Sequence, residues 1–239
     1  MDRSPPAAAF VVATHGRVNL IGEHTDYNDG FVMPMAIERG VRCIVRRRAD
    51  GVLSLRSAGM GPEVVIDPAG PLLPGRSDWA RYPLGVIAGY ATRGFTIPGC
   101  DLAFSADLPA GGGLSSSAAL EVAVATAIET LCGRSLDPVE KALLCQEAEH
   151  RFAGVPCGIM DQFAVTCCRP GHALLLDCRS RACRHVPLDD PGVTVMVIDS
   201  GVKHELASGE YARRRDDCRR AAARIHPRPV RASRRCRSP

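Results

Sequence analysis

Apolar positions along the chain follow two different periods. β-Branched or alternating apolar residues predict strands at residues 10–13, 41–47, 52–56 and 101–106. A nearly continuous apolar run, VTVMVI at residues 193–198, follows a turn at Gly192 and predicts a buried strand. Helical spacing predicts helices at residues 114–131 and 138–152 and an amphipathic helix at residues 205–224. This mixed order of strands and helices predicts an α+β fold without an internal repeat.

The second predicted helix carries a carboxylate in an unexpected place. Glu149 falls in line with the apolar residues Ala142 and Cys145, on the stripe that faces the core. A carboxylate is not buried there without a partner. One alternative is that Glu149 binds a metal ion. The other, which the spacing alone favours, is that it lies at the edge of the stripe and reaches water or Arg151.

A second polar feature is the segment GRVNLIGEHTDYND at residues 16–29. It places five hydrogen-bonding side chains between glycines: Arg17, Glu23, His24, Asp26 and Asn28. A sugar, whose hydroxyls both donate and accept hydrogen bonds, needs carboxylates and imidazole converging on it. A polar surface loop after the apolar run at residues 18–21 is the alternative, and local chemistry does not decide between them.

A glycine-rich segment, LPAGGGLSSSAA at residues 108–119, leads into the first predicted helix. Glycines let a backbone approach an anion closely, and the N-terminus of the following helix attracts it. No lysine follows the glycines, so this is not a Walker A motif, and Ser116 stands where a Rossmann motif has its third glycine. The segment indicates a phosphate site, with a turn capped by serines as the alternative.

These two segments carry a family resemblance. GRVNLIGEHTDYN resembles the galactokinase signature, and GGGLSSSAAL resembles the phosphate-binding motif of the GHMP family of small-molecule kinases. A third match, CGIMDQFA at residues 157–164, follows in the expected order, and the resemblance spans residues 10–222. One departure is that Thr14 and His15 precede Gly16, where galactokinases usually have a proline. The chain thus resembles the galactokinases.

The resemblance implies a catalytic pair. Asp161 lies between the apolar residues Met160 and Phe163. An acid with apolar neighbours is either a helix cap or a functional carboxylate. By resemblance Asp161 is the base that accepts the proton of the sugar's anomeric hydroxyl while the γ-phosphoryl group is transferred. Arg17 then stabilises the developing charge.

The resemblance also implies residues for each ligand. Sugar contacts fall on Glu23, His24, Thr25, Asp26, Gly158 and Tyr211. ATP contacts fall on Ser57, Trp79, Gly111, Gly112, Gly113, Leu114, Ser115, Ser116 and Ser117. Mg²⁺ falls on Ser117 and Glu149. By spacing alone, Tyr211 is equally an ordinary helix residue, and a lone tryptophan such as Trp79 is more often core than ligand contact.

Composition fits an intracellular enzyme. With 46% hydrophobic residues, 239 residues can bury a sizeable core. The N-terminus lacks the pattern of a signal peptide, and no apolar stretch is long enough for a membrane span. The eleven cysteines are odd in number and include no Cys-x-x-Cys, so we expect reduced thiols in a cytoplasmic protein and no zinc site. Cys100, Cys132, Cys145 and Cys157 lie in apolar surroundings.

The net charge of +4 is distributed unevenly. Residues 213–239 hold eleven arginines and two acids, a net charge of +9, which leaves residues 1–212 at −5. A basic tail can bind nucleic acid. From His226 onward, however, the tail has three prolines and no acid, so we expect a disordered segment without a nucleic-acid partner.

The family resemblance implies a division of the chain. We expect a GHMP N-terminal domain at residues 1–200, the start of a second α+β domain at residues 201–224 and the basic tail at residues 225–239. GHMP kinases of this type close their site with a second domain that carries a third glycine-rich motif. No such motif follows Gly192, so we expect an apparently truncated chain with weak ATP binding and little turnover.

The expected activity is a monomeric kinase that makes α-D-galactose 1-phosphate from galactose and MgATP. Two alternatives remain open at this point. One is a regulatory protein that binds galactose and ATP without turnover. The other is a GHMP kinase for a different sugar, such as N-acetylgalactosamine. Intact Arg17, Asp161 and Glu149 favour catalysis over sensing.

Overall fold

A computed structural model describes residues 9–67, 70, 72–73, 79–109, 112–198 and 210–225, with side chains in the last segment from Arg213 onward. Its strands are β1 (Ala9–Asn19), β2 (Phe31–Val32), β3 (Pro34–Arg47), β4 (Leu53–Ser57), β5 (Val64–Ile66), β6 (Cys100–Ala106), β7 (His172–Asp177) and β8 (Ala182–Pro187). Its helices are α1 (Arg81–Thr92), α2 (Ser116–Cys132), α3 (Pro138–Ala148), α4 (Met160–Cys167) and α5 (Glu210–Ile225), with a π-helical turn η1 (Glu149–Ala153) after α3.

The eight strands form one sheet that is mainly antiparallel. β3 lies at its centre, pairing with β1 along most of its length and with β6 on its other side. β4 runs parallel to β6, and β8 forms a hairpin with β7 at the other end of the sheet. The pairing of β1 with β3 shifts between His15 and Arg17. A bulge of this kind re-aims side chains, and here it comes directly before Arg17.

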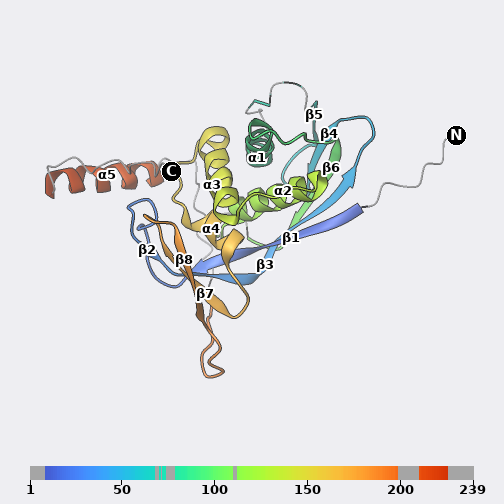
Figure 1. The fold of residues 1–239 in the computed structure, drawn as a ribbon. Helices are drawn as coiled ribbons and strands as arrows, with labels where there is room; N and C mark the ends of the chain where they lie inside the picture. The colour runs from blue at the N-terminus through green and yellow to red at the C-terminus, as the bar shows by residue number, and fades with distance from the viewer. Residues whose placement is uncertain are drawn as a thin grey trace, which may run out of the picture.

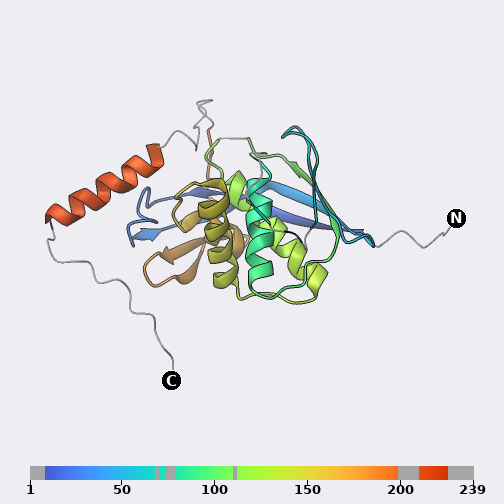
Figure 2. The ribbon, with the colours of Figure 1, turned by 90° about the horizontal axis from the view of Figure 1, so that it is seen from above.

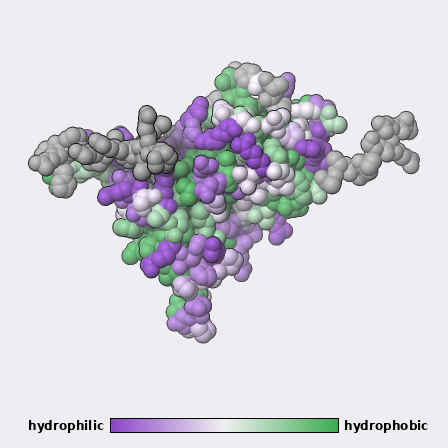
Figure 3. Space-filling view, in the orientation of Figure 1, coloured by the Kyte–Doolittle hydropathy of each residue, from purple (hydrophilic) through white to green (hydrophobic). Residues whose placement is uncertain are grey.

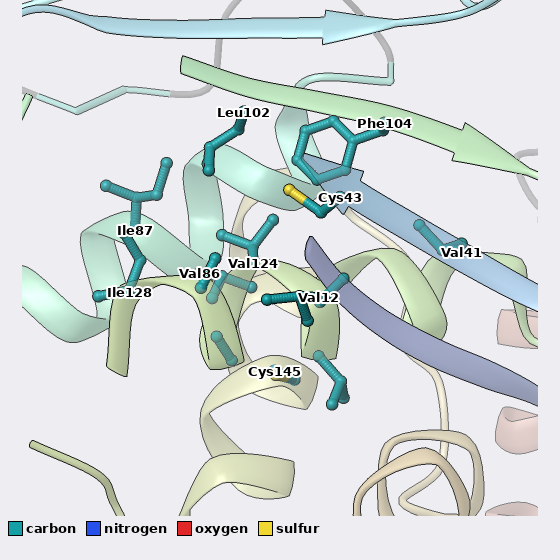
Figure 4. Packing of buried hydrophobic residues seen from close by; sticks show 14 of the residues in the cluster. Val12, Val41, Cys43, Val86, Ile87, Leu102, Phe104, Val124, Ile128 and Cys145 are labelled. Atoms are coloured by element: carbon teal, nitrogen blue, oxygen red, sulfur yellow. The ribbon is translucent and has the colours of Figure 1, made fainter. Parts of the chain in front are cut away.

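Helices α1 to α4 form a second layer on one face of the sheet (Figures 1 and 2). The core lies between the layers, where strand residues meet α1, α2 and α3 (Figure 4). Residues from each layer are labelled there, among them Val12, Val41, Cys43, Leu102, Ile87, Val124 and Cys145. α2 is buried on nearly every side, and its many alanines let it approach the sheet closely. The predicted α+β fold is confirmed, with the sheet and the helices as its two layers.

A buried ionic network ties three helices together. Glu129 of α2 accepts a hydrogen bond from the Tyr90 hydroxyl of α1 at 2.7 Å and from the Leu136 amide at 2.9 Å. Its other oxygen lies 2.6 Å from the Lys141 ammonium of α3. Burial, followed by the hydrogen bond to Glu129, raises the pKa of Tyr90. The network holds α1, α2 and α3 in fixed positions relative to one another. The positions of the ends of α2 and α3 are fixed as a result.

Most predicted elements are confirmed, with shifted ends. The four predicted strands lie within or overlap β1, β3, β4 and β6. α2 begins at Ser116 because Ser115 adopts a left-handed conformation with φ of 60°. The helix predicted at residues 138–152 instead changes to the π-helical turn at Glu149.

The buried strand predicted at residues 193–198 is wrong. These residues form no strand, and their apolar side chains are exposed, with Met196 at 78% and Ile198 at 81%. A continuous apolar run is buried as a strand only where neighbouring strands pair with it. In the described part of the chain none does, since the edge strand β8 pairs only with β7.

α5 projects from one end of the molecule in both ribbon views (Figures 1 and 2). The predicted helix at residues 205–224 is confirmed from Glu210, whereas residues 205–209 lie outside the described part. Its described side chains are mostly exposed, and Arg215 donates a hydrogen bond to the Pro156 carbonyl at 3.2 Å. Elsewhere on the face in Figure 3, hydrophilic and hydrophobic residues are interspersed. None of the described helices could cross a membrane.

Candidate active site

The three sequence motifs meet at Arg17. Its Nε and Nη2 atoms donate to Oδ1 of Asp161, at 2.9 and 2.6 Å, and its Nη1 donates to the Gly113 carbonyl. Its backbone amide donates to the Leu114 carbonyl at 3.2 Å. The side chain of Arg17 is 11% exposed and that of Asp161 is 27% exposed, so the pair is open to a ligand from one side. One guanidinium therefore joins β1, the glycine-rich loop and α4.

The glycine-rich loop leads into the N-terminus of α2. Gly113 and Ser115 both have positive φ, at 68° and 60°, which turns the chain sharply before Ser116 begins the helix. No side chain caps this helix end, so its amides remain available to an anion. The hydroxyl of Ser115 is buried without a hydrogen-bond partner among the described residues. Gly112 lies in the described part of the loop, whereas Gly111 lies outside it.

Glu149 and Ser117 are brought together as predicted, although they come from different helical segments. The Ser117 hydroxyl is hydrogen-bonded to the Glu149 carboxylate, which is only 3% exposed at the first residue of η1. Burial raises the pKa of Glu149 to about 7, and the charge of Asp161 contributes in the same direction. A hydroxyl beside a carboxylate is the oxygen donor set that Mg²⁺ prefers. These two residues therefore fit a magnesium ion.

Two further residues of this cluster were missed from the sequence. Gln162 is fully buried, and its Nε2 donates to Glu149 at 2.6 Å and to Glu121 at 3.0 Å. Burial, with the charge of Glu149, raises the pKa of the fully buried Glu121. A signal was present, because Glu121 follows Ser117 by one helical turn on α2 and Gln162 directly follows Asp161. In this cluster, one side-chain amide is thus hydrogen-bonded to two carboxyl groups.

Cys157 completes the surroundings of Glu149. Its thiol donates to Oε2 of Glu149 at 3.5 Å, and burial, followed by the charge of Glu149, raises its pKa. The thiol is therefore a hydrogen-bond donor to the carboxylate and not a thiolate. It was expected only as a thiol in apolar surroundings.

The raised pKa of Glu149 predicts how stability depends on pH. Without Mg²⁺, this residue binds a proton more tightly in the folded protein, at a pKa of about 7, than in the unfolded chain, at 4.5. Its contribution to the free energy of unfolding should therefore be full below about pH 4.5 and be lost as the pH rises through about 7. Over this pH range the free energy of unfolding should therefore fall less in the Glu149→Gln variant than in the parent chain. We expect the difference to reach up to about 3 kcal/mol.

The measurement is urea unfolding in EDTA at about pH 5 and about pH 8. Glu147→Gln is the matched control, because Glu147 lies on the exposed side of α3 and pairs with Arg93 and Arg151. The same loss of stability with pH in Glu149→Gln as in the parent chain would contradict this prediction.

The sugar loop reaches the same place through Asp26. Asp26 is 8% exposed, and its carboxylate packs against Gly158 so closely that a Cβ there would lie 1.8 Å from Oδ2. Burial raises the pKa of Asp26, as does the charge of Asp161, while backbone amides, Met160 foremost, oppose the shift. The structure thus brings together Asp26, Gly158 and Asp161, whose roles toward a ligand stay predictions.

The side chains of the other predicted sugar residues each form a hydrogen bond within or near the sugar loop. Glu23 is exposed and accepts a hydrogen bond from Asn19 at 2.9 Å. His24, which has φ of 59°, forms a 2.7 Å hydrogen bond between its Nδ1 and the Tyr27 hydroxyl. The Thr25 hydroxyl is 2.7 Å from the carbonyls of Gly22 and of Phe31 in β2, so this residue links the loop to β2. A sugar contact by Thr25 stays a prediction.

Two residues outside the motifs, Ser57 and Trp79, were predicted to contact the nucleotide. Trp79 is 4% exposed and packs edge-on against Phe104 at 6.2 Å, so its indole belongs to the core. Ser57 ends β4 and is the register partner of Phe104. Trp79 thus contacts the Phe104 ring and Ser57 neighbours the Phe104 backbone, and a nucleotide contact by either residue stays a prediction. Tyr211 lies in α5, but its side chain is outside the described residues.

Family comparisons agree with the motifs. Residues 81–169 match the GHMP kinases N terminal domain, and residues 2–47 match the galactokinase galactose-binding signature. The chain is 46% identical over 216 residues to a galactokinase of Streptomyces coelicolor and 46% identical over 220 residues to a galactokinase of Homo sapiens. Each alignment covers 89% of this chain and 56% of the relative. The chain thus spans little more than half the length of these relatives.

Solved structures give the same relationship. A Lactococcus lactis galactokinase complexed with galactose superposes with a TM-score of 0.82 at 29% identity, covering 95% of this chain and 58% of that one. A Methanococcus jannaschii mevalonate kinase shares the fold, with a TM-score of 0.62 at 18% identity over 76% of this chain and 57% of that one. With its motifs, its fold and its relatives in agreement, the chain contains a GHMP kinases N terminal domain and a galactokinase galactose-binding signature, and it is similar to galactokinases.

Proposed function

We propose that this chain carries the galactose- and ATP-binding part of a kinase that phosphorylates the anomeric hydroxyl of D-galactose. The product is α-D-galactose 1-phosphate. The observation that carries the proposal is the Arg17–Asp161 pair, which lies between the sugar loop and the glycine-rich loop. A kinase needs a carboxylate at the nucleophilic hydroxyl and a cation near the transferred phosphoryl group, and this pair supplies both.

Asp161 would act as the base. It accepts the proton of the anomeric hydroxyl as that oxygen attacks the γ-phosphorus of ATP. Arg17 holds the Asp161 carboxylate through two N–H groups and contacts the carbonyl of Gly113 in the phosphate loop. Its charge therefore lies where negative charge builds up on the phosphoryl oxygens. The side-chain exposure of Asp161, 27%, leaves it accessible to the sugar.

The sugar would be held by Asp26 and its loop. The Asp26 carboxylate is fixed by backbone amides and lies near Asp161, so a hydroxyl bound to Asp26 places its neighbour close to the base. Glu23 and His24 extend the same loop toward solvent and add hydrogen bonds. Gly158 leaves room for the Asp26 carboxylate. Tyr211 is the remaining proposed contact, from α5.

ATP would lie along the glycine-rich loop. The free amides at the N-terminus of α2 and the unpaired Ser115 hydroxyl are donors for phosphate oxygens. Ser117 and Glu149 would hold Mg²⁺, which neutralises charge on the phosphates when bound. We further propose a monomeric cytoplasmic protein with galactose and MgATP as its ligands and no nucleic-acid partner.

Asp26→Ala tests the sugar site. Because the change removes a charged hydrogen-bond acceptor, we expect galactose binding to weaken by ~1.5–3 kcal/mol, roughly 10- to 150-fold. The measurement is isothermal titration calorimetry with galactose. Asp29→Ala is the matched control, because Asp29 lies on the same loop but is exposed, 4.0 Å from Arg179. Unchanged galactose affinity in Asp26→Ala would remove Asp26 from the site.

A further inference from the structure

A pair of cysteines lies apart from the active-site cluster, where α4 meets the edge strand β8. Cys167 is the last residue of α4, and Cys183 lies in β8. Their thiols are hydrogen-bonded to each other. The Nε2 atom of His185 forms a second link, at 2.7 Å from the Cys167 carbonyl. Because residues 183 and 185 of a strand share one face, both links hold the end of α4 against the same face of β8.

The two thiols differ in reactivity and access. Cys183 is exposed, and its hydrogen bond from Cys167 lowers its pKa, which favours the thiolate. The pKa of Cys167 is raised by the same hydrogen bond and by burial, so it stays a thiol. An accessible cysteine that accepts a hydrogen bond from a second thiol is the arrangement of a peroxide-reactive pair. Among the described residues, no group of three or more histidines, cysteines and acids could hold a metal ion at this pair.

We propose that Cys167 and Cys183 are a modification site, a thiol pair that hydrogen peroxide converts to a reversible disulfide. The Cys183 thiolate attacks one peroxide oxygen, the O–O bond breaks, and hydroxide leaves, giving a sulfenic acid. The Cys167 sulfur then attacks the Cys183 sulfur, and the sulfenic oxygen leaves as water with the Cys167 proton. Two thiols are oxidised and one peroxide is reduced to water in total.

The disulfide would fasten the C-terminal end of α4 to β8. β8 pairs only with β7, so this edge otherwise has few constraints among the described strands. Asp161 lies in the first turn of α4, at the opposite end from Cys167. Closing the loop between the two cysteines should therefore raise the melting temperature by about 5 °C and leave galactose affinity unchanged.

The test is oxidation of the folded chain with hydrogen peroxide, unfolding, capping of free thiols with N-ethylmaleimide, and mass spectrometry after trypsin digestion. The expected result is a loss of two thiols and a disulfide from Cys183, in the short peptide at residues 182–184, to Cys167. Dithiothreitol should restore both thiols, and the melting temperature should rise only in the oxidised protein.

Three variants separate this pair from other thiols. Cys183→Ser and Cys167→Ser should each abolish the linked peptide and the rise in melting temperature. Cys168→Ser is the matched control and should retain both, because Cys168 directs its thiol to the Pro34 carbonyl at 3.9 Å. A link from Cys183 to Cys168 or Cys178, a disulfide-linked dimer, or a sulfinic acid without any linked peptide would each overturn the proposal.

Discussion

Replacing Asp161 by asparagine should lower the rate of phosphoryl transfer to galactose by about 100- to 10,000-fold. Asparagine keeps the size of the side chain, and its amide oxygen can still accept a hydrogen bond from Arg17, which donates to Asp161 at 2.9 and 2.6 Å in the parent chain. It cannot accept the proton of the sugar hydroxyl. The amides at the start of α2 remain in place, so nucleotide binding should be spared.

The rate is measured as ADP release from galactose and MgATP. Because the chain spans 56% of the Streptomyces coelicolor relative, each variant is also tested in a chimera that adds that relative's C-terminal part. Asp50→Asn is the control, since Asp50 takes part in a surface ion pair with Arg48. Full activity in Asp161→Asn, in a preparation whose parent is active, would refute the assignment of Asp161 as the base.

Replacing Gly158 by alanine should weaken galactose binding by at least about 100-fold, equal to about 2.7 kcal/mol. The added Cβ would lie 1.8 Å from Oδ2 and 2.1 Å from Cγ of Asp26, distances that no pair of atoms tolerates without displacement. Because backbone amides fix the Asp26 carboxylate, it can move aside only by giving up those hydrogen bonds. The sugar site should be lost even where the protein stays folded.

Calorimetry with galactose and thermal unfolding are measured on the same preparations. Gly171→Ala is the matched control: Gly171 has φ of 67° and open space around it, so alanine there strains the backbone without touching the site. This control should lose about 1 kcal/mol of stability and keep its galactose affinity. If Gly158→Ala bound galactose like the parent, the contact with Asp26 would not shape the site.

The sequence alone predicted those parts of the molecule that local chemistry controls. The glycine-rich segment was predicted to lead directly into a helix, and α2 begins at Ser116 without the serine cap that was the alternative. The strands rich in β-branched residues appear in β1, β3, β4 and β6. The roles of Arg17 and Asp161 came from matching family motifs and not from periodicity, and the structure brings the two residues into contact.

Several elements left too weak a local signal. β5 and β2 are only three and two residues long, and α4 has eight residues. α1 was not predicted either, although Leu84, Val86 and Ile87 are buried in it. Such short or weakly patterned segments are fixed by the elements that they pack against, and pattern alone does not report those neighbours.

Tertiary structure decided which polar groups share one environment. The sequence determined that Glu149 stands on an apolar stripe, but left open whether it reaches water or a metal ion. Only the fold buries it with Glu121 and Gln162, from two other helices, because burial and charge depend on residues far apart in the chain. The same dependence exposes the apolar run at residues 193–198, because no described strand pairs with it.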